Sequence, residues 1–215
     1  MPIKVNECAD NAGEFFSFWV GTIISPRKTI KRILQKEDAW FGFSSALLYG
    51  LLYIITAVFL VINHLRPVMP PILPISEENY YLWQLFFTIP VCLFGWVILG
   101  WVAYLLVAKL LKASGSLMNY LNTLGFSFYI PCIITMWLPE TLVAIIRPDA
   151  WGNPSVFGPF WSWFSQVYLW IGFAWAIALS VLAVKQAGKV SWPKSTLATL
   201  ISIAAAMGFY ITFIR

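Results

Sequence analysis

Charged residues are scarce in this chain. Lysine, arginine, aspartate and glutamate make up 11% of its 215 residues, whereas an ordinary soluble domain has about 25%. The hydrophobic fraction is 60% and the aromatic fraction is 18%, and so few charges cannot form a solvated shell around that much apolar surface. The composition therefore excludes a soluble globular protein and indicates that lipid surrounds most of the chain.

Side chains typical of catalysis and metal binding are equally scarce. The chain has one histidine, His64, and three cysteines, with no glycine-rich phosphate loop and no cluster of histidines and carboxylates. Cys132 and Met136 lie one helical turn apart, but two soft donors without a repeated motif favour packing over a Cu(I) site. We therefore expect a protein that is not an enzyme and that has no cofactor and no metal ion. Because Cys8, Cys92 and Cys132 lie in cytoplasmic or membrane segments, we expect no disulfide.

Five long apolar runs follow one another along the chain. Each reaches the roughly 20 residues that a helix needs to cross a hydrocarbon core, and none shows the alternation of a barrel strand. The sequence therefore predicts an all-α polytopic integral membrane helix bundle with five transmembrane helices. The predicted spans are residues 41–62, 81–110, 117–138, 160–184 and 195–214.

The basic residues divide unequally between the two sides of these spans. Eleven fall on one side, which are Lys4, Arg27, Lys28, Lys31, Arg32, Lys36, Lys109, Lys112, Lys185, Lys189 and Lys194. The other side has Arg66, Arg147 and Arg215, beside several acidic residues. The positive-inside bias predicts a cytoplasmic N-terminus and an outside C-terminus. The net charge of +5 then reflects topology and attraction to anionic headgroups, and indicates no nucleic-acid partner.

Residues 1–38 form the predicted cytoplasmic segment, with amphipathic interfacial helices, and residues 39–215 form the five-span domain. The apolar run 15–24 is too short to span a membrane, and Ser25-Pro26 predicts the N-cap and first residue of a second helix. That helix carries a set of basic residues, named here the lipid-surface set: Arg27, Lys28, Lys31, Arg32 and Lys36. Such a helix is expected to anchor the chain at the membrane surface, and lipid sensing or partner docking is the alternative.

Several features of the spans predict helix packing. Pro90 and Pro131 are expected to kink the second and third spans. Small residues recur at intervals of four in the last two spans, at Gly172, Ala176 and Ser180 and at Ala198, Ser202 and Ala206. Such stripes let helix backbones approach closely in lipid, either within one bundle or across a homo-oligomer seam. Packing within the bundle is favoured.

Glu140 is the acidic residue whose depth in the membrane is uncertain from sequence. It follows Pro139 and precedes an apolar stretch, so it is buried if the third span continues to residue 146 and interfacial if the span ends at Pro139. Length favours the second interpretation, because residues 117–138 already cross a bilayer. In the alternative of a transport pathway along the kinked spans two and three, Glu140 would join Cys92, Ser127 and Thr135.

Three segments resemble the Yip family, the Ypt/Rab-interacting multispanning membrane proteins. They are the basic SPRKTIKRI at 25–33, DAWFGF at 38–43 and LGFSFYIP at 124–131. The resemblance implies a five-span fold with a cytoplasmic N-terminus, and it singles out six family-motif and helix-packing residues: Asp38, Trp40, Gly42, Gly125, Ser127 and Pro131. Eukaryotic members are associated with Rab GTPases and vesicle traffic. The short N-terminal segment of this chain favours a prokaryotic member instead, which implies the plasma (inner) membrane.

Physical reasoning assigns these motif residues structural roles. Gly125 and Ser127 allow close approach to a neighbouring helix, Pro131 bends the third span, and Asp38 can accept bonds from the free amides that open the first span. We expect a non-enzymatic membrane protein that organises membrane lipid or partner proteins. Its expected partners are anionic lipid headgroups and a protein or a second copy of the chain. The alternative is a transporter or channel for a small or lipidic solute.

Overall fold

The computed structural model describes the backbone of residues 5–214 and the side chains of residues 12–153 and 155–214. Lys4, Arg215 and the side chain of Cys8, on which part of the sequence prediction rests, lie outside this part. The described residues form helices and their connections, without a strand. The helices are α1 (Val5–Ile24), α2 (Pro26–Ile33), α3 (Trp40–Ile62), α4 (Tyr80–Tyr104), α5 (Leu117–Cys132), α6 (Leu138–Ile146), α7 (Pro159–Gly188) and α8 (Trp192–Phe213).

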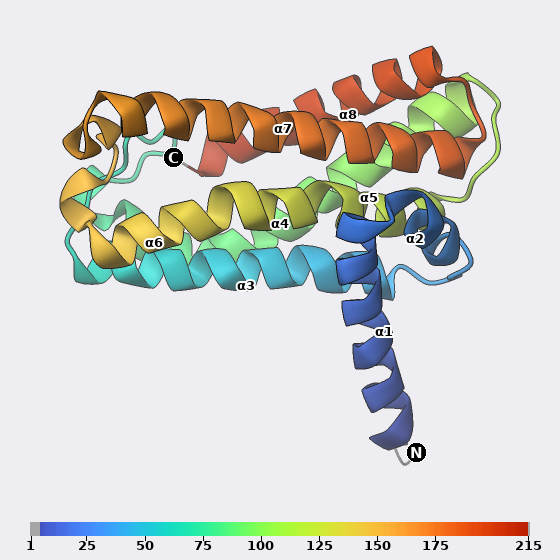
Figure 1. The fold of residues 1–215 in the computed structure, drawn as a ribbon, viewed down its shortest axis with the longest axis horizontal. Coiled ribbons are helices and arrows are strands. Elements are labelled where there is room, and N and C mark those ends of the chain that lie inside the picture. Colours follow the sequence, from blue (N-terminus) through green and yellow to red (C-terminus); the bar gives the residue numbers. More distant parts are fainter. Residues whose placement is uncertain (1–4, 215) are drawn as a thin grey trace.

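Five helical stretches are long and apolar enough to cross a membrane, which confirms the predicted all-α membrane bundle. They are Trp40–Ile62, Glu77–Leu110, Leu117–Ile146, Pro159–Gly188 and Trp192–Phe213. The second ends in a π-helical turn, Leu105–Leu110, and the third contains another, Ile133–Trp137. Consecutive stretches run in opposite directions along the long axis of the bundle, which is horizontal in Figure 1.

The predicted end of the third span is wrong. The helix does not stop at Pro139 but continues through α6 to Ile146. A proline inside a regular helix removes one backbone hydrogen bond and collides with the carbonyl one turn earlier. Here the wider π-helical turn Ile133–Trp137 comes directly before Pro139, and this irregularity accommodates the proline without ending the helix. Glu140 is therefore part of the long third stretch.

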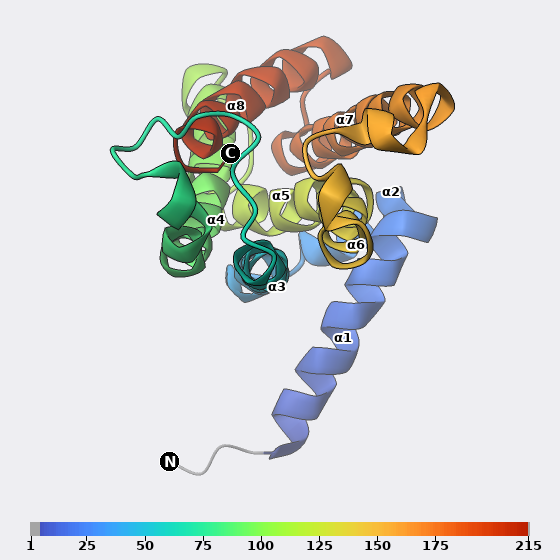
Figure 2. The ribbon, with the colours of Figure 1, turned by 90° about the vertical axis from the view of Figure 1, so that its left-hand side faces the viewer.

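Helix α5 lies at the centre of the bundle, with α3, α4 and α7 around it (Figure 2). Every residue from Tyr120 to Cys132 is buried, whereas helices at the edge of the bundle bury one face. Further out, α4 packs on α8 and α3 packs on α4. A helix that is apolar around its whole circumference is buried on all sides, so α5 is the element on which the other helices assemble.

The small-residue stripes of α7 and α8 lie inside the bundle. Ala176 and Ser180 of α7 are buried, and so are Ala198, Ser202 and Ala206 of α8. A Cβ atom added at Gly172 would collide with the side chain of Thr135, which follows α5. These residues therefore serve close packing within one chain, as the sequence favours.

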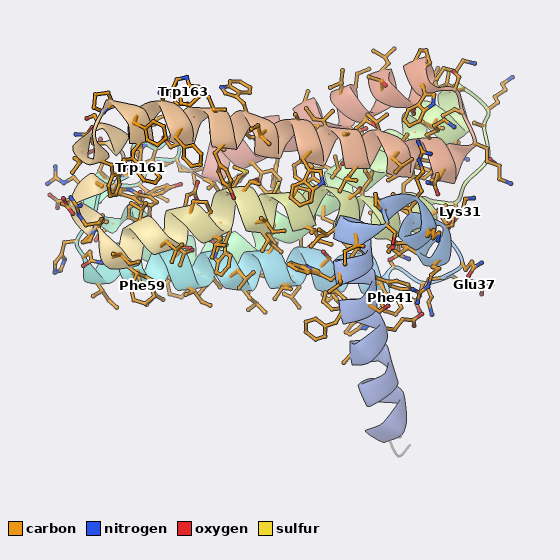
Figure 3. The ribbon with its side chains drawn as sticks, viewed as in Figure 1. Lys31, Glu37, Phe41, Phe59, Trp161 and Trp163 are labelled. Carbon is orange, nitrogen blue, oxygen red and sulfur yellow. The ribbon has the colours of Figure 1, made fainter. Side chains whose placement is uncertain are left out.

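Helices α1 and α2 lie at one end of the bundle, and α1 runs across the bundle axis instead of along it (Figures 1 and 2). Helix α2 begins at Pro26 after Ser25, as predicted. The α4–α5 and α7–α8 connections lie at the same end, which we call the basic end because it carries Lys36, Lys112 and Lys189. Figure 3 shows Lys31 and Glu37 at this end and Phe59, Trp161 and Trp163 toward the other.

The close approach of α3 and α5 provides a test of this packing. A Cβ atom added at Gly125 of α5 would lie 2.6 Å from Cα of Gly42 in α3, and 2.8 Å from its carbonyl oxygen. Because backbone cannot move aside as a side chain does, we expect Gly125→Ala to lower the unfolding free energy by about 1–3 kcal/mol. The measurement is thermal unfolding in detergent micelles.

Gly208→Ala in α8 is the matched control. A Cβ atom there meets no atom within 4 Å, and alanine favours a helix over glycine by about 1 kcal/mol. The control is expected to keep or raise the unfolding temperature. An equal response of the two variants would contradict the proposed contact.

Candidate functional site

The two central motifs of the sequence lie against each other, DAWFGF at the start of α3 and LGFSFYIP in α5. Asp38 Oδ1 accepts a hydrogen bond from the amide of Trp40 at 3.1 Å, as predicted. The buried amide of Gly42, two residues further along, donates to Asn122 Oδ1 at 2.8 Å. Asn122 Nδ2 donates in turn to the carbonyl of Asp38. The first turn of α3 is thus capped partly by its own aspartate and partly by a side chain from α5.

Further polar bonds fasten α5 to α3 and α4. We call these bonds, those of Asn122 and the Gly42–Gly125 approach together the polar seam. Ser45 Oγ of α3 donates to the carbonyl of Gly125 at 2.7 Å. Trp96 Nε1 of α4 donates to the carbonyl of Leu121 at 2.8 Å. Lipid provides no hydrophobic force between helices, so small residues and hydrogen bonds of this kind hold them together.

The remaining motif residues have different surroundings. Ser127 is fully buried, and its hydroxyl has no hydrogen-bond partner among the described residues. The carbonyl of Pro131 accepts a bond from Thr135 Oγ1 at 2.8 Å. Trp40 is exposed and stacks on Phe43, with ring centroids 5.7 Å apart. Among the six motif residues, Asp38, Gly42 and Gly125 meet in the polar seam.

Helix α1 is docked beside the polar seam through aromatic side chains. Phe18 is fully buried and packs on Phe41 of α3 and Phe126 of α5, with ring centroids 5.2 and 6.0 Å apart. Ile33 of α2 and Ile130 of α5 complete this small core. The N-terminal helices are therefore packed against the bundle itself.

Two members of the lipid-surface set hold α1 and α2 together. Lys36 Nζ lies 2.7 Å from Glu14 Oε2 and 5.3 Å from the ring centroid of Phe41. The guanidinium of Arg32 lies 5.0 Å from the ring centroid of Phe18. Cations placed over aromatic rings in this way contribute favourable electrostatic energy. Arg32 and Lys36 therefore position the N-terminal helices.

The other three members of the lipid-surface set keep their charges available. Arg27, Lys28 and Lys31 are exposed, and no ion pair of theirs occurs within the described part of the chain. Arg27 and Lys31, one helical turn apart on α2, line a pocket together with Lys185 of α7 and Trp192 of α8. The structure thus brings together basic residues that are about 155 positions apart in sequence.

The side chains of the alternative transport pathway contact different helices. Cys92 of α4 is buried against Gly50 of α3, and Thr135 lies against Gly172 of α7. Glu140 is partly buried and accepts a hydrogen bond from Tyr53 Oη of α3 at 2.7 Å. A carboxylate within a spanning helix is energetically costly unless it is paired. The bond from Tyr53 lowers this cost, so the third span can continue past Pro139 with Glu140 in it.

The space beside Cys92 is occupied by tyrosines. Tyr129 Oη of α5 donates to the carbonyl of Cys92 at 3.0 Å and is hydrogen-bonded to Tyr210 Oη of α8. Both rings are buried, and so is that of Trp96. Aromatic side chains therefore fill the space between α4, α5 and α8 beside Cys92. Within the described side chains, no three His, Cys, Asp or Glu residues converge as metal ligands would.

At the opposite end of the bundle, the two described arginines are paired with acidic residues. Arg147 Nε and Nη2 donate to the two carboxylate oxygens of Asp149 at 2.9 and 2.7 Å, and this guanidinium holds the pKa of Asp149 below its usual value. Arg66 lies 3.3 Å from Glu78. Free positive charge is therefore concentrated at the basic end.

Comparison with known proteins agrees with this geometry. The family model described as the Yip1 domain matches residues 20–214, which is nearly the whole chain. The chain belongs to the Yip1 family. No curated protein and no solved structure matches it. The family match confirms the resemblance seen in the sequence. The matched region includes α2, all five spanning stretches and the polar seam.

Sequence reasoning missed two parts of this Yip1-domain structure. Asn122 lies two residues before LGFSFYIP, and an amide in the middle of a spanning segment is a signal in itself, because it needs a partner there. Lys185 entered only the count of charges by side, and Trp192 was not considered. Their proximity to Arg27 depends on how α2 packs against α7, and no local pattern encodes that.

Asn122 provides a test of the polar seam. Asn122→Leu removes the acceptor for the Gly42 amide and the donor to Asp38. We expect the unfolding free energy to fall by about 1–3 kcal/mol, since a buried donor is left unpaired. The control is Asn119→Leu, about one turn earlier in α5, whose hydrogen bonds among the described residues come from the backbone. Equal unfolding temperatures of the two variants in detergent would refute the role of Asn122.

Proposed function

We propose that this multi-pass Yip1-family protein is a non-enzymatic organiser of the membrane. It gathers anionic lipid, and with it partner proteins, at its basic end. The observation that supports this proposal best is the placement of α1 and α2. Both are packed on the bundle at one end, while Arg27, Lys28 and Lys31 stay exposed and outside any ion pair in the described part of the chain.

The direction of α1 supports an interfacial position. Because the long helices cross the membrane along the bundle axis, a helix that crosses this axis near one end lies in the plane of the interface (Figure 1). Its outer side exposes Phe16, Val20 and Ile24, which are suited to enter the acyl-chain region. The adjoining basic residues of α2 would then lie at headgroup level, where each contributes about 1 kcal/mol of attraction to an anionic surface.

The orientation of the chain is part of the proposal. Unpaired lysines and arginines at the basic end, and paired arginines at the other, support a cytoplasmic basic end in the plasma membrane. Residues 1–38 are proposed as the interfacial cytoplasmic segment and residues 39–215 as the spanning domain. The protein partner is then a cytoplasmic or neighbouring membrane protein, or a second copy of the chain.

Two conservative cysteine variants test the orientation. Ser191→Cys in the α7–α8 connection and Ser155→Cys in the α6–α7 connection are both exposed, whereas the native Cys92 and Cys132 are buried. In a Cys8→Ser background, a membrane-impermeant thiol reagent applied to intact cells should label Ser155→Cys and spare Ser191→Cys. Reversed labelling would end the topology proposal.

Charge reversal outside the pocket tests the organising role. Lys28 and Lys194 are exposed at the basic end, so Lys28→Glu with Lys194→Glu turns two attractive sites into repulsive ones. We expect the anionic lipid that copurifies in lipid nanoparticles to fall by roughly twofold or more, with a smaller difference at high salt. The charge-conserving pair Lys28→Arg and Lys194→Arg is the control. Equal anionic-lipid content in both proteins would refute the role of these charges.

A further inference from the structure

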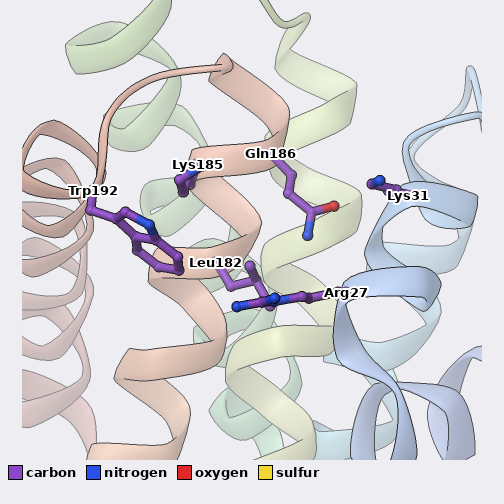
Figure 4. Close-up of a pocket in the computed structure, with 6 residues that line it drawn as sticks. All are labelled: Arg27, Lys31, Leu182, Lys185, Gln186 and Trp192. Atoms are coloured by element: carbon purple, nitrogen blue, oxygen red, sulfur yellow. The ribbon is translucent and has the colours of Figure 1, made fainter.

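A pocket at the basic end lies between α2, the last turns of α7 and the start of α8 (Figure 4). It has a volume of about 360 Å³. Its lining residues are Arg27, Lys31, Leu182, Lys185, Gln186 and Trp192. Three of the six carry a positive charge and none carries a negative one. A cavity with this lining is suited to an anion.

The three cations lack protein counterions. Within the described part of the chain, neither Arg27, Lys31 nor Lys185 forms an ion pair. Lys185 Nζ lies 5.1 Å from the ring centroid of Trp192, which holds it at the pocket. Like charges brought together in this way repel each other, and a bound anion with several acceptor oxygens would relieve the repulsion.

Gln186 adds an unpaired polar group. Its Oε1 atom is buried and has no hydrogen-bond partner among the described residues. Figure 4 shows its amide extending from α7 toward Lys31 and Arg27 on α2. A buried acceptor without a donor is unfavourable, and a ligand hydroxyl placed beside the anionic group would satisfy it. The pocket therefore fits a ligand with both an anionic oxygen cluster and hydroxyl groups.

The apolar lining indicates where the rest of the ligand lies. Leu182 is one turn further into the spanning helix than Lys185 and Gln186, and Trp192 is half-exposed at the start of α8. Tryptophan at such a position is typical of the boundary between headgroups and acyl chains. Cations at the end of the bundle with an apolar residue below them match the order of parts in a phospholipid.

We propose that this pocket binds the phosphate of a hydroxylated anionic headgroup, such as the glycerol headgroup of phosphatidylglycerol. Arg27, Lys31 and Lys185 contact the phosphate oxygens, and Gln186 Oε1 accepts a hydrogen bond from a headgroup hydroxyl. The bound headgroup links α2 to α7 and α8. This inference rests on the proposed function and narrows it from a diffuse basic surface to one saturable site for each chain.

The test uses the full chain in lipid nanoparticles of phosphatidylcholine, titrated with phosphatidylglycerol. Native mass spectrometry counts the lipids that stay bound at high salt, where diffuse surface attraction is screened. We expect one retained phosphatidylglycerol per chain. Arg27→Ala with Lys185→Ala should weaken its binding roughly tenfold or more, since charge-assisted bonds are lost. Lys28→Ala with Lys194→Ala removes the same charge from the same end and should bind like the wild type.

Two further arms identify the ligand. Glycerol 3-phosphate and inorganic phosphate are offered as competitors, and displacement of the lipid at equal concentration would show that a free phosphate is the ligand and overturn the lipid source. Gln186→Leu should bind phosphatidylglycerol more weakly and leave binding of phosphatidic acid, which lacks the headgroup hydroxyls, unchanged. Equal loss for both lipids would overturn the hydroxyl contact.

Failure of the pocket is distinguishable from failure of the proposed function. Equal retention of phosphatidylglycerol by the two double-alanine variants would overturn the pocket. In that case, a loss of anionic-lipid enrichment in the Lys28→Glu, Lys194→Glu protein would still support the organising role. The absence of any anionic-lipid enrichment in the wild type would overturn both. Thermal unfolding in phosphatidylcholine alone checks folding. Arg27 is exposed and Lys185 is partly exposed, and Lys185→Ala loses the contact with the Trp192 ring.

Discussion

The close contact between Gly42 and Gly125 is the constraint on which the rest of the structure depends. In lipid, two apolar helices gain little by leaving their solvent, so their association relies on backbone approach and hydrogen bonds. The glycines supply the approach, and Asn122, Ser45 and Trp96 supply the bonds. Because these contacts bring α3 and α4 onto α5, they determine where every outer helix can pack.

The N-terminal helices depend on the same contact. Phe18 packs between Phe41, directly before Gly42, and Phe126, directly after Gly125. A shift between α3 and α5 would therefore disturb the docking of α1, and with it the position of α2. The basic residues of α2 are thus placed by the packing of two spanning helices.

Most of the fold could be predicted from the sequence because lipid imposes simple rules on length and charge. Long apolar runs predicted the five spans, and motif glycines predicted close packing. The third span differs because residues 117–138 already have the length to cross a bilayer, but a helix can continue beyond that minimum where tertiary contacts support it. The π-helical turn before Pro139 and the bond from Tyr53 to Glu140 both favour continuation, and neither is visible in the residues around Pro139.

The pocket shows a second limit of sequence reasoning, which concerns distance. A count of lysines and arginines on each side of the membrane ignores the distances between them. Arg27 and Lys185 contribute equally to that count whether they lie close together or far apart. A binding site requires that they lie within reach of one ligand, and that depends on how α2 packs against α7. At the opposite end, Arg66 and Arg147 have acidic partners close in sequence. Within the described part of the chain the three pocket cations have no acidic partner, and this is the reason for proposing an anion from outside the chain at the pocket.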